Sequence, residues 1–201
     1  MNTHPPSIYR EDPSPAVDAA WDRIANVRTT AISRDDVIKL GKDPSIAAKY
    51  PPSFGLGNDA FIAEIDVFHQ IHCLDALRRE IFFDHYYSSR FPDGKPSELH
   101  KQHTSHCIYI LLQNLMCSAS VDVITHRWLD VQKHPFPDFN IQKKCRNFED
   151  VLAWQEKNVV DDAPYHMLRR PAEMKPVITS DEFKDIFHQW NYEANDDLHV
   201  H

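Results

Sequence analysis

The feature that most constrains this chain is a pentapeptide, His-x-x-His-Cys, that occurs twice. The first copy consists of His69, His72 and Cys73, and the second of His103, His106 and Cys107. Apolar residues recur every three to four positions around both copies. This periodicity predicts two long helices, from about Phe68 to Tyr87 and from the N-cap Ser97 to about Ala119.

Residues three positions apart lie on the same face of a helix, one turn from each other. The two histidines of each copy therefore point in the same direction. If the two helices pack together, four imidazoles and two sulfur atoms converge, as in metal sites built between facing helices of a bundle. Imidazole suits zinc, copper, iron and nickel, and copper(II) heads the general affinity order. The sequence thus predicts a metal site formed by His69, His72, His103 and His106.

A single His-x-x-His pair on a helix is more often a pair of partly exposed or hydrogen-bonded histidines, but two matching copies favour a shared site. His100 extends the spacing of His103, although a solvent-facing histidine in the first helical turn explains it equally well. Neither copy contains the glutamate of His-Glu-x-x-His, which is the general base of many zinc proteases. Its absence shifts the expected chemistry from hydrolysis to oxidation.

The four cysteines allow three disulfide pairings. Cys107 and Cys117 lie about 15 Å apart on one predicted helix, which exceeds the Cα separation of about 7 Å that a disulfide can span. The remaining choices are Cys73–Cys107 with Cys117–Cys145, or Cys73–Cys117 with Cys107–Cys145. We expect at least one disulfide and hence an oxidising compartment. Free thiols, two of them soft ligands for copper(I), are the alternative.

Shorter elements are expected around the two long helices. Helices should begin after Ser14, Ser33 and Asn147, which are favourable N-cap residues. The segments "RTTAIS" and "AFIAEIDVF" read as two strands that pair, "VDVITHRWL" as a strand or hairpin, and "HPFPDFN" as a loop. We therefore predict a mainly α domain over residues 14–159 with a small β-hairpin element. An extended N-terminal arm, 1–13, precedes it, and a C-terminal extension with one amphipathic helix, 160–201, follows it.

Charge argues against a nucleic-acid partner, and hydropathy argues against a membrane span in the sequence as given. The chain has 22 lysines and arginines against 30 aspartates and glutamates, whereas proteins that bind nucleic acids present a basic surface. No apolar run reaches the length of a membrane span, so the sequence as given predicts a soluble chain. Its polar, proline-rich start lacks a signal peptide. A membrane anchor is expected only if the native chain begins earlier.

Three blocks, "VFHQIHCLDALRR", "HTSHCIYILLQNLMCSAS" and "CRNFEDVLAW", resemble those of the UstYa-like family, and the similarity extends over about residues 9–159. This fungal family is implicated in oxidative tailoring of ribosomally made cyclic peptides and other toxins, by macrocyclisation, hydroxylation, desaturation or halogenation. Copper dependence has been proposed for it. The resemblance implies a location in the lumen of the secretory pathway, a single N-terminal membrane anchor in the full-length protein, and a homodimer or a heterodimer with another family member.

Two positions depart from the family pattern. After its first motif the chain has the acidic residue and the arginine that the resemblance implies, Asp75 and Arg78, but after the second it has Tyr109 and Leu112. Ser120 also stands where the family commonly has aspartate. The metal ligands are therefore retained while the residues around them differ.

These observations lead to one main functional expectation, a copper-dependent oxidase that acts on a peptide or another natural-product intermediate. The four histidines would hold one or two copper ions, because side chains alone have no route to one-electron oxygen chemistry. Tyr109 and Asp75 are candidate catalytic residues. One alternative is a non-redox or metal-assisted cyclase that uses Asp75, Tyr109 and a histidine. Another is a non-catalytic accessory protein in which histidines and disulfides serve structure.

Overall fold

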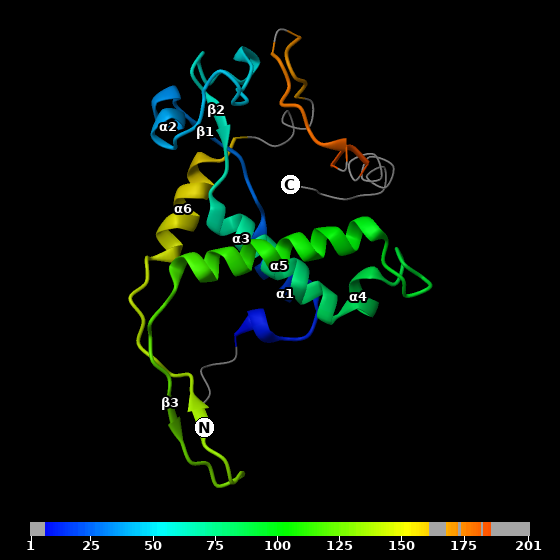
Figure 1. Ribbon diagram of the computed structural model, residues 1–201, viewed down its shortest axis with the longest axis vertical. Helices are drawn as coiled ribbons and strands as arrows, with labels where there is room; N and C mark the ends of the chain where they lie inside the picture. Colours follow the sequence, from blue (N-terminus) through cyan, green and yellow to red (C-terminus); the bar gives the residue numbers. More distant parts are fainter. Residues whose placement is uncertain (1–6, 161–167, 173, 182, 186–201) are drawn as a thin grey trace.

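The computed structural model describes residues 7–160, 168–172, 174–181 and 183–185. Helices dominate this part of the chain, and two small antiparallel sheets accompany them. Figure 1 shows α3 (Asp66–Ile81) and α5 (Glu98–Ser118) crossing near the centre, with α1 (Pro15–Ala25) behind them. The predicted fold class, mainly α with two long motif-bearing helices and a small β element, is confirmed.

Side-chain caps fix where several helices begin. A cap accepts a hydrogen bond from a backbone N–H of the first turn, which has no partner inside the helix. The caps are Ser14 for α1, Ser33 for α2 (Arg34–Lys39), Ser97 for α5 and Asn147 for α6 (Phe148–Asn158). All four were predicted from the sequence and are confirmed.

The first long helix is shorter than predicted. It begins at Asp66, ends at Ile81, and is followed by the separate short helix α4 (Phe83–Tyr87). At Phe82 the backbone leaves the helical region (φ −109°, ψ 42°), and its N–H bonds to the carbonyl of Arg79 three residues back. The apolar periodicity continues through this break because Phe83 and Tyr87 still face inward, against Phe91. Periodicity alone therefore merged two helices into one.

The two sheets contain two strands each. β1 (Thr30–Ile32) pairs with β2 (Phe61–Ala63) as predicted, although β2 occupies only the start of the expected strand. β3 (Thr125–Arg127) pairs with β4 (Phe136–Asp138). The prediction of a loop at "HPFPDFN" is wrong, because β4 lies there. Pro137 is tolerated since each strand of a two-stranded sheet is an edge strand, where a missing N–H costs little.

The core lies where α1, β2, α3, α5 and α6 meet. Its most deeply buried side chains are Val17, Val27, Phe61, Phe68, Cys73, Cys107 and Leu152. Phe68 on α3 packs against Phe148 at the start of α6, with ring centroids 5.9 Å apart. This core fixes α3, and with it the first histidine pair, against the rest of the fold.

Three predictions concern the ends of the chain. Within the predicted N-terminal arm, Ile8–Arg10 form a short 3₁₀ helix, and Tyr9 packs edge-on against Trp21 of α1. The predicted C-terminal amphipathic helix begins after Ser180, whose Oγ accepts from the N–H of Phe183, but most of it lies outside the described residues. No helix in the described part of the chain has the length and apolar character needed to cross a bilayer.

Candidate metal centre

The structure brings the four predicted histidines together between α3 and α5. The rings of His69 and His106 have centroids 6.0 Å apart, as do those of His72 and His103. Because the earlier histidine of one motif faces the later histidine of the other, the two helices run antiparallel. An approximate two-fold axis between α3 and α5 therefore relates the two motifs. Each facing pair takes one histidine from each motif, so the site needs both copies of the pentapeptide.

The two motif cysteines lie buried between the same helices. Each sulfur lies 4.0 Å from Nε2 of the first histidine of its own motif, Cys73 from His69 and Cys107 from His103. The Cys107 thiol donates a hydrogen bond to the Cys73 sulfur, which lowers the pKa of Cys73 and raises that of Cys107. All four cysteines of the chain are free thiols in the structure, so the predicted disulfide is not confirmed.

The four imidazoles differ in exposure. His106 is exposed, whereas His69, His72 and His103 are half-buried. Burial lowers the pKa of His103, and the charges of neighbouring histidines lower it further. His103 is therefore neutral near pH 7, and a neutral imidazole is the form that binds a metal ion. The centre has a more buried end at His103 and an open end at His106.

The donors suit a copper or zinc ion, but their spacing is wider than a bound ion requires. Two imidazoles on one tetrahedral ion have centroids about 5 Å apart, given a metal–nitrogen distance of about 2.0 Å. The observed centroid separations are 6.0 Å across the helices and 6.4 Å between His69 and His72. Within the described residues, no three His, Cys, Asp or Glu side chains are close enough as they stand to hold an ion. Binding one ion therefore requires the facing rings to close by about 1 Å.

Asp75, predicted as catalytic, lies in a buried ion-pair network on the α1 side of α3. Its two carboxylate oxygens accept hydrogen bonds from Nε of Arg78 (2.6 Å) and Nε of Arg79 (2.7 Å). Arg78 also donates to Asp18 of α1 and to Tyr86 of α4. Helical spacing allows the pairs of Asp75 with Arg78 and Arg79, but the contact of Arg78 with Asp18 could not be predicted because it joins residues 60 positions apart.

Tyr109, the other predicted catalytic residue, lies on α5 and is 55% exposed. Leu112 is also exposed, and Ser120 donates a hydrogen bond to the carboxylate of Asp122 just beyond α5. None of the described contacts joins Tyr109 or Asp75 to the four imidazoles. Their catalytic roles stay predictions.

His100 is not the solvent-facing residue that the sequence allowed. Its side chain is 9% exposed, and its Nε2 donates to Oε1 of Glu80 on α3. Phe83, Tyr87 and Phe91 pack edge-on around its ring. Burial, together with the charge of Glu80, raises the pKa of Tyr87 to about 12. His100 therefore ties α5 to α3 beside the metal centre rather than extending it.

Comparisons with known proteins add an independent line of observation. The sequence model of the family described as "Mycotoxin biosynthesis protein UstYa" matches residues 1–158. The chain belongs to the UstYa family. It is 40% identical over 172 residues to "UstYa family oxidase aprY" of Aspergillus flavus, a match that covers 82% of this chain and 51% of aprY.

Other UstYa-family proteins match with lower identity. "UstYa family oxidase phomYc" of Diaporthe leptostromiformis is 33% identical over 158 residues, 77% of this chain and 60% of phomYc. "Oxidase ustYa" of Aspergillus flavus is 29% identical over 98 residues, 48% of this chain and 41% of ustYa. The chain thus spans about half the length of the curated relatives it matches. No solved structure matches it.

Proposed function

We propose that this UstYa-family chain forms the catalytic part of a copper-dependent oxidase that tailors a peptide or another fungal natural-product intermediate. The tailoring step would be an oxidative cyclisation, hydroxylation, desaturation or related reaction, with dioxygen as the oxidant. The observation that carries the proposal is the two facing pairs of imidazoles, His69 with His106 and His72 with His103, each with ring centroids 6.0 Å apart. The names of relatives such as aprY and phomYc, which are oxidases, support it.

The four histidines would hold one or two copper ions after the facing rings close. Copper bound there would supply the one-electron oxygen chemistry that amino-acid side chains lack. His103, neutral because it is buried, offers a lone pair without having to lose a proton. His106 is exposed, so a substrate can approach the centre from its open end.

A location in the secretory pathway and a disulfide are parts of the same proposal. The buried Cys73 and Cys107 thiols interact with each other between α3 and α5, so an oxidising compartment could join them in a disulfide. A disulfide at this point would fix the two motif helices to each other directly beside the imidazoles.

The acid–base cyclase has less support from the geometry. A general acid or base must reach the substrate, yet Asp75 is buried and both of its oxygens are held by arginines. Tyr109 is exposed on the motif helix α5 and can contact a substrate more readily. Among the two predicted catalytic residues, Tyr109 is therefore the better candidate for a role in an oxidase.

The proposal is tested by metal titration of the full chain. Metal-free protein is titrated with copper(II) and separately with zinc(II), beside His72→Ala/His103→Ala and His69→Ala/His106→Ala. We expect the wild type to take up one or two equivalents of copper, with nitrogen hyperfine structure in its electron paramagnetic resonance spectrum. Each double variant should bind at least about 100-fold more weakly, since changes even to groups that only support a ligand cost about 10–100-fold.

The matched control is His85→Ala/His126→Ala, which removes two exposed histidines outside the centre. It should bind copper like the wild type. Equal and weak binding by the wild type and all variants would overturn the copper centre, and would leave the metal-free cyclase or the accessory protein as the better reading. Loss of binding in the control alone would place the metal elsewhere.

A further inference from the structure

A row of exposed side chains on α5 leads away from the open end of the metal centre. The row consists of His106, Tyr109, Gln113 and Met116 and is here called the α5 stripe. The spacings of three, four and three residues place these side chains on one side of the helix. All four are exposed, Tyr109 at 55% and Met116 at 61%. Because the stripe begins at an imidazole of the centre, a molecule that lies along it touches the centre at one end.

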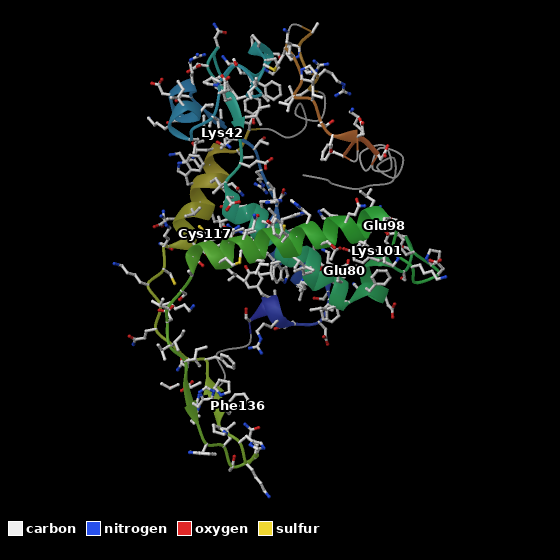
Figure 2. The ribbon with its side chains drawn as sticks, viewed as in Figure 1. Lys42, Glu80, Glu98, Lys101, Cys117 and Phe136 are labelled. Carbon is white, nitrogen blue, oxygen red and sulfur yellow. The ribbon has the colours of Figure 1, made fainter. Side chains whose placement is uncertain are left out.

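The stripe lies in the part of α5 that has no charged side chains. The aspartates, glutamates, lysines and arginines of α5 are limited to Glu98 and Lys101, and none occurs in residues 102–118. Figure 2 shows Glu98 and Lys101 near one end of the helix and Cys117 at the other. A charged group that left water to lie on the stripe would find no ionic partner on α5, and such a transfer is costly. The part of a bound molecule that contacts the stripe is therefore uncharged.

The equivalent positions of α3 show that this lack of charge belongs to α5 alone. After the motif cysteine, α3 has Asp75 and Arg78, which form a buried ion pair at 2.6 Å. The equivalent residues of α5, Tyr109 and Leu112, are apolar and yet exposed. A helix side that faces water ordinarily carries charged and polar residues, whereas exposed apolar patches mark binding sites. The position of this patch beside His106 identifies the bound molecule as the substrate.

Gln113 gives the stripe a polar group that matches a peptide bond. Its side chain is exposed, and within the described residues its amide makes no hydrogen bond. The neighbouring Asn114, by contrast, donates to the carbonyl of Ile110 at 3.1 Å. A glutamine amide offers both a donor and an acceptor. Gln113 can therefore bond to the N–H or the C=O of an extended peptide, which carries the same two groups.

The length of the stripe sets the length of the segment that it can hold. Met116 follows His106 by 10 residues, which corresponds to about 15 Å along a helix. An extended peptide rises about 3.3 Å per residue. A segment of about four or five residues therefore covers the stripe from one end to the other.

We propose that the α5 stripe selects the substrate of this chain, and that it binds an uncharged, largely apolar segment of an extended peptide. The reacting residue of the peptide lies beside His106. Tyr109 and Met116 contact its apolar side chains, and Gln113 bonds to its backbone. This inference rests on the proposed function, because it names the chemical class of the substrate and the residues that recognise it.

The test is the binding of three blocked pentapeptides to the full chain, measured by nuclear magnetic resonance of its backbone amides. The probes are acetyl-Ser-Leu-Phe-Leu-Ser-amide and the two peptides in which both leucines are replaced by lysine or by glutamate. The uncharged peptide should bind at least about tenfold more tightly than either charged peptide, because the stripe offers a charge no partner. It should shift the amide resonances of residues 106–116 and leave those of α2 unchanged.

Met116→Ser and Leu115→Ser form a matched pair of variants. Both residues are exposed and apolar, at 61% and 70%, but Leu115 follows His106 by nine residues and so lies on the opposite side of α5. Met116→Ser should weaken binding of the uncharged peptide about fivefold or more, because an apolar contact is lost. Leu115→Ser should leave the binding unchanged. Equal losses in both variants would mean that the peptide adheres to any apolar side chain of α5, and would overturn the proposal.

Copper titration of the same samples separates this inference from the proposed function. Met116→Ser should bind copper like the wild type, since Met116 lies about 15 Å along α5 from His106. A wild type that binds the uncharged peptide at residues 106–116 but takes up no copper would support the stripe and overturn the copper centre. A wild type that binds copper but does not prefer the uncharged peptide, or binds it away from α5, would overturn the stripe alone.

Discussion

The two helices that carry the repeated motif differ in what covers the residues after it. On α3, Asp75 and Arg78 are buried against α1 in a network of ion pairs. On α5, the equivalent positions hold Tyr109 and Leu112, which are exposed. The motif is therefore repeated while its surroundings are not. The approximate two-fold relation of the four imidazoles therefore does not extend to the residues that follow them. On α3 these residues are buried against α1, and on α5 they are exposed.

The largest expected effect comes from a substitution in the buried ion-pair network between α1 and α3. Arg78→Leu, which gives α3 the residue that α5 has, should lower the free energy of unfolding by about 3–5 kcal/mol, the usual cost of removing one partner of a buried ion pair. The side chains of Arg78 and Asp75 are both 8% exposed, and Arg78 also donates hydrogen bonds to Asp18 and Tyr86. Urea unfolding followed by circular dichroism measures the change.

Arg23→Leu is the matched control, because Arg23 pairs with Glu156 on the surface. Its cost should be about 0–1 kcal/mol. If Arg78→Leu cost no more than this control, the covered side of α3 would be no better anchored than an ordinary surface. The contrast between α3 and α5 would then lose its energetic basis.

A second effect concerns the N-terminal half of α5, which α3 and α4 hold in place. His100→Ala should lower the free energy of unfolding by about 1.5–3 kcal/mol, the range for hydrogen bonds to charged groups. The change removes the bond to Glu80 and opens the aromatic cluster of Phe83, Tyr87 and Phe91. Thermal unfolding measures it.

His126→Ala, at an exposed site in β3, is the control for His100→Ala and should change stability by less than about 0.5 kcal/mol. Copper binding should survive His100→Ala, since His100 bonds Glu80 rather than facing another imidazole. Loss of copper binding with unchanged stability would mean that His100 is a ligand.

Much of the fold could be predicted from local patterns. Ser14, Ser33, Ser97 and Asn147 mark helix starts because capping depends on residues within one turn. The repeated pentapeptide gives the four imidazoles because helical spacing places them on one face. The exposure of Ile108, Leu112 and Leu115 on α5 was not predicted, since an apolar stripe on a helix ordinarily indicates burial in a core.

The failures have separate physical causes. Asp75 reads as a candidate catalytic acid until Arg79 and the α1 side chains near it are known. The break at Phe82 escapes a periodicity argument because the residues on both sides, Ile81 and Phe83, are apolar. Phe136–Asp138 reads as loop because it contains Pro137 and follows Pro135, yet it pairs with Thr125–Arg127 across a turn.

A third expected effect is a loss of folding stability at low pH, which arises from the ion pair between Asp18 of α1 and Arg78 of α3. Burial raises the pKa of Asp18, but hydrogen bonds from Tyr86 and Arg78 outweigh it, so the pKa lies below its ordinary value of 3.8. A carboxyl whose pKa is lower in the folded state stabilises the fold above its unfolded pKa, and this contribution is lost as the pH falls through the folded pKa. Stability should therefore fall below about pH 4.

The variant Asp18→Asn isolates that contribution. Asp36 and Asp43 also have lowered pKa values. The loss of wild-type stability at low pH therefore cannot be attributed to Asp18 without the variant. Between about pH 4 and 2 the wild type should lose more stability than Asp18→Asn does. Parallel curves for the two proteins would show that the network around Arg78 does not depend on the charge of Asp18.

The smallest expected effect comes from giving α5 the residues of α3. Tyr109→Asp/Leu112→Arg places an acid and an arginine three residues apart on an exposed face, and such a pair is worth about 0.2–0.5 kcal/mol. The unfolding free energy should therefore change by no more than about 0.5 kcal/mol. A loss above about 1 kcal/mol would mean that Tyr109 and Leu112 are already packed within the chain. The two motif helices would then differ in sequence rather than in burial.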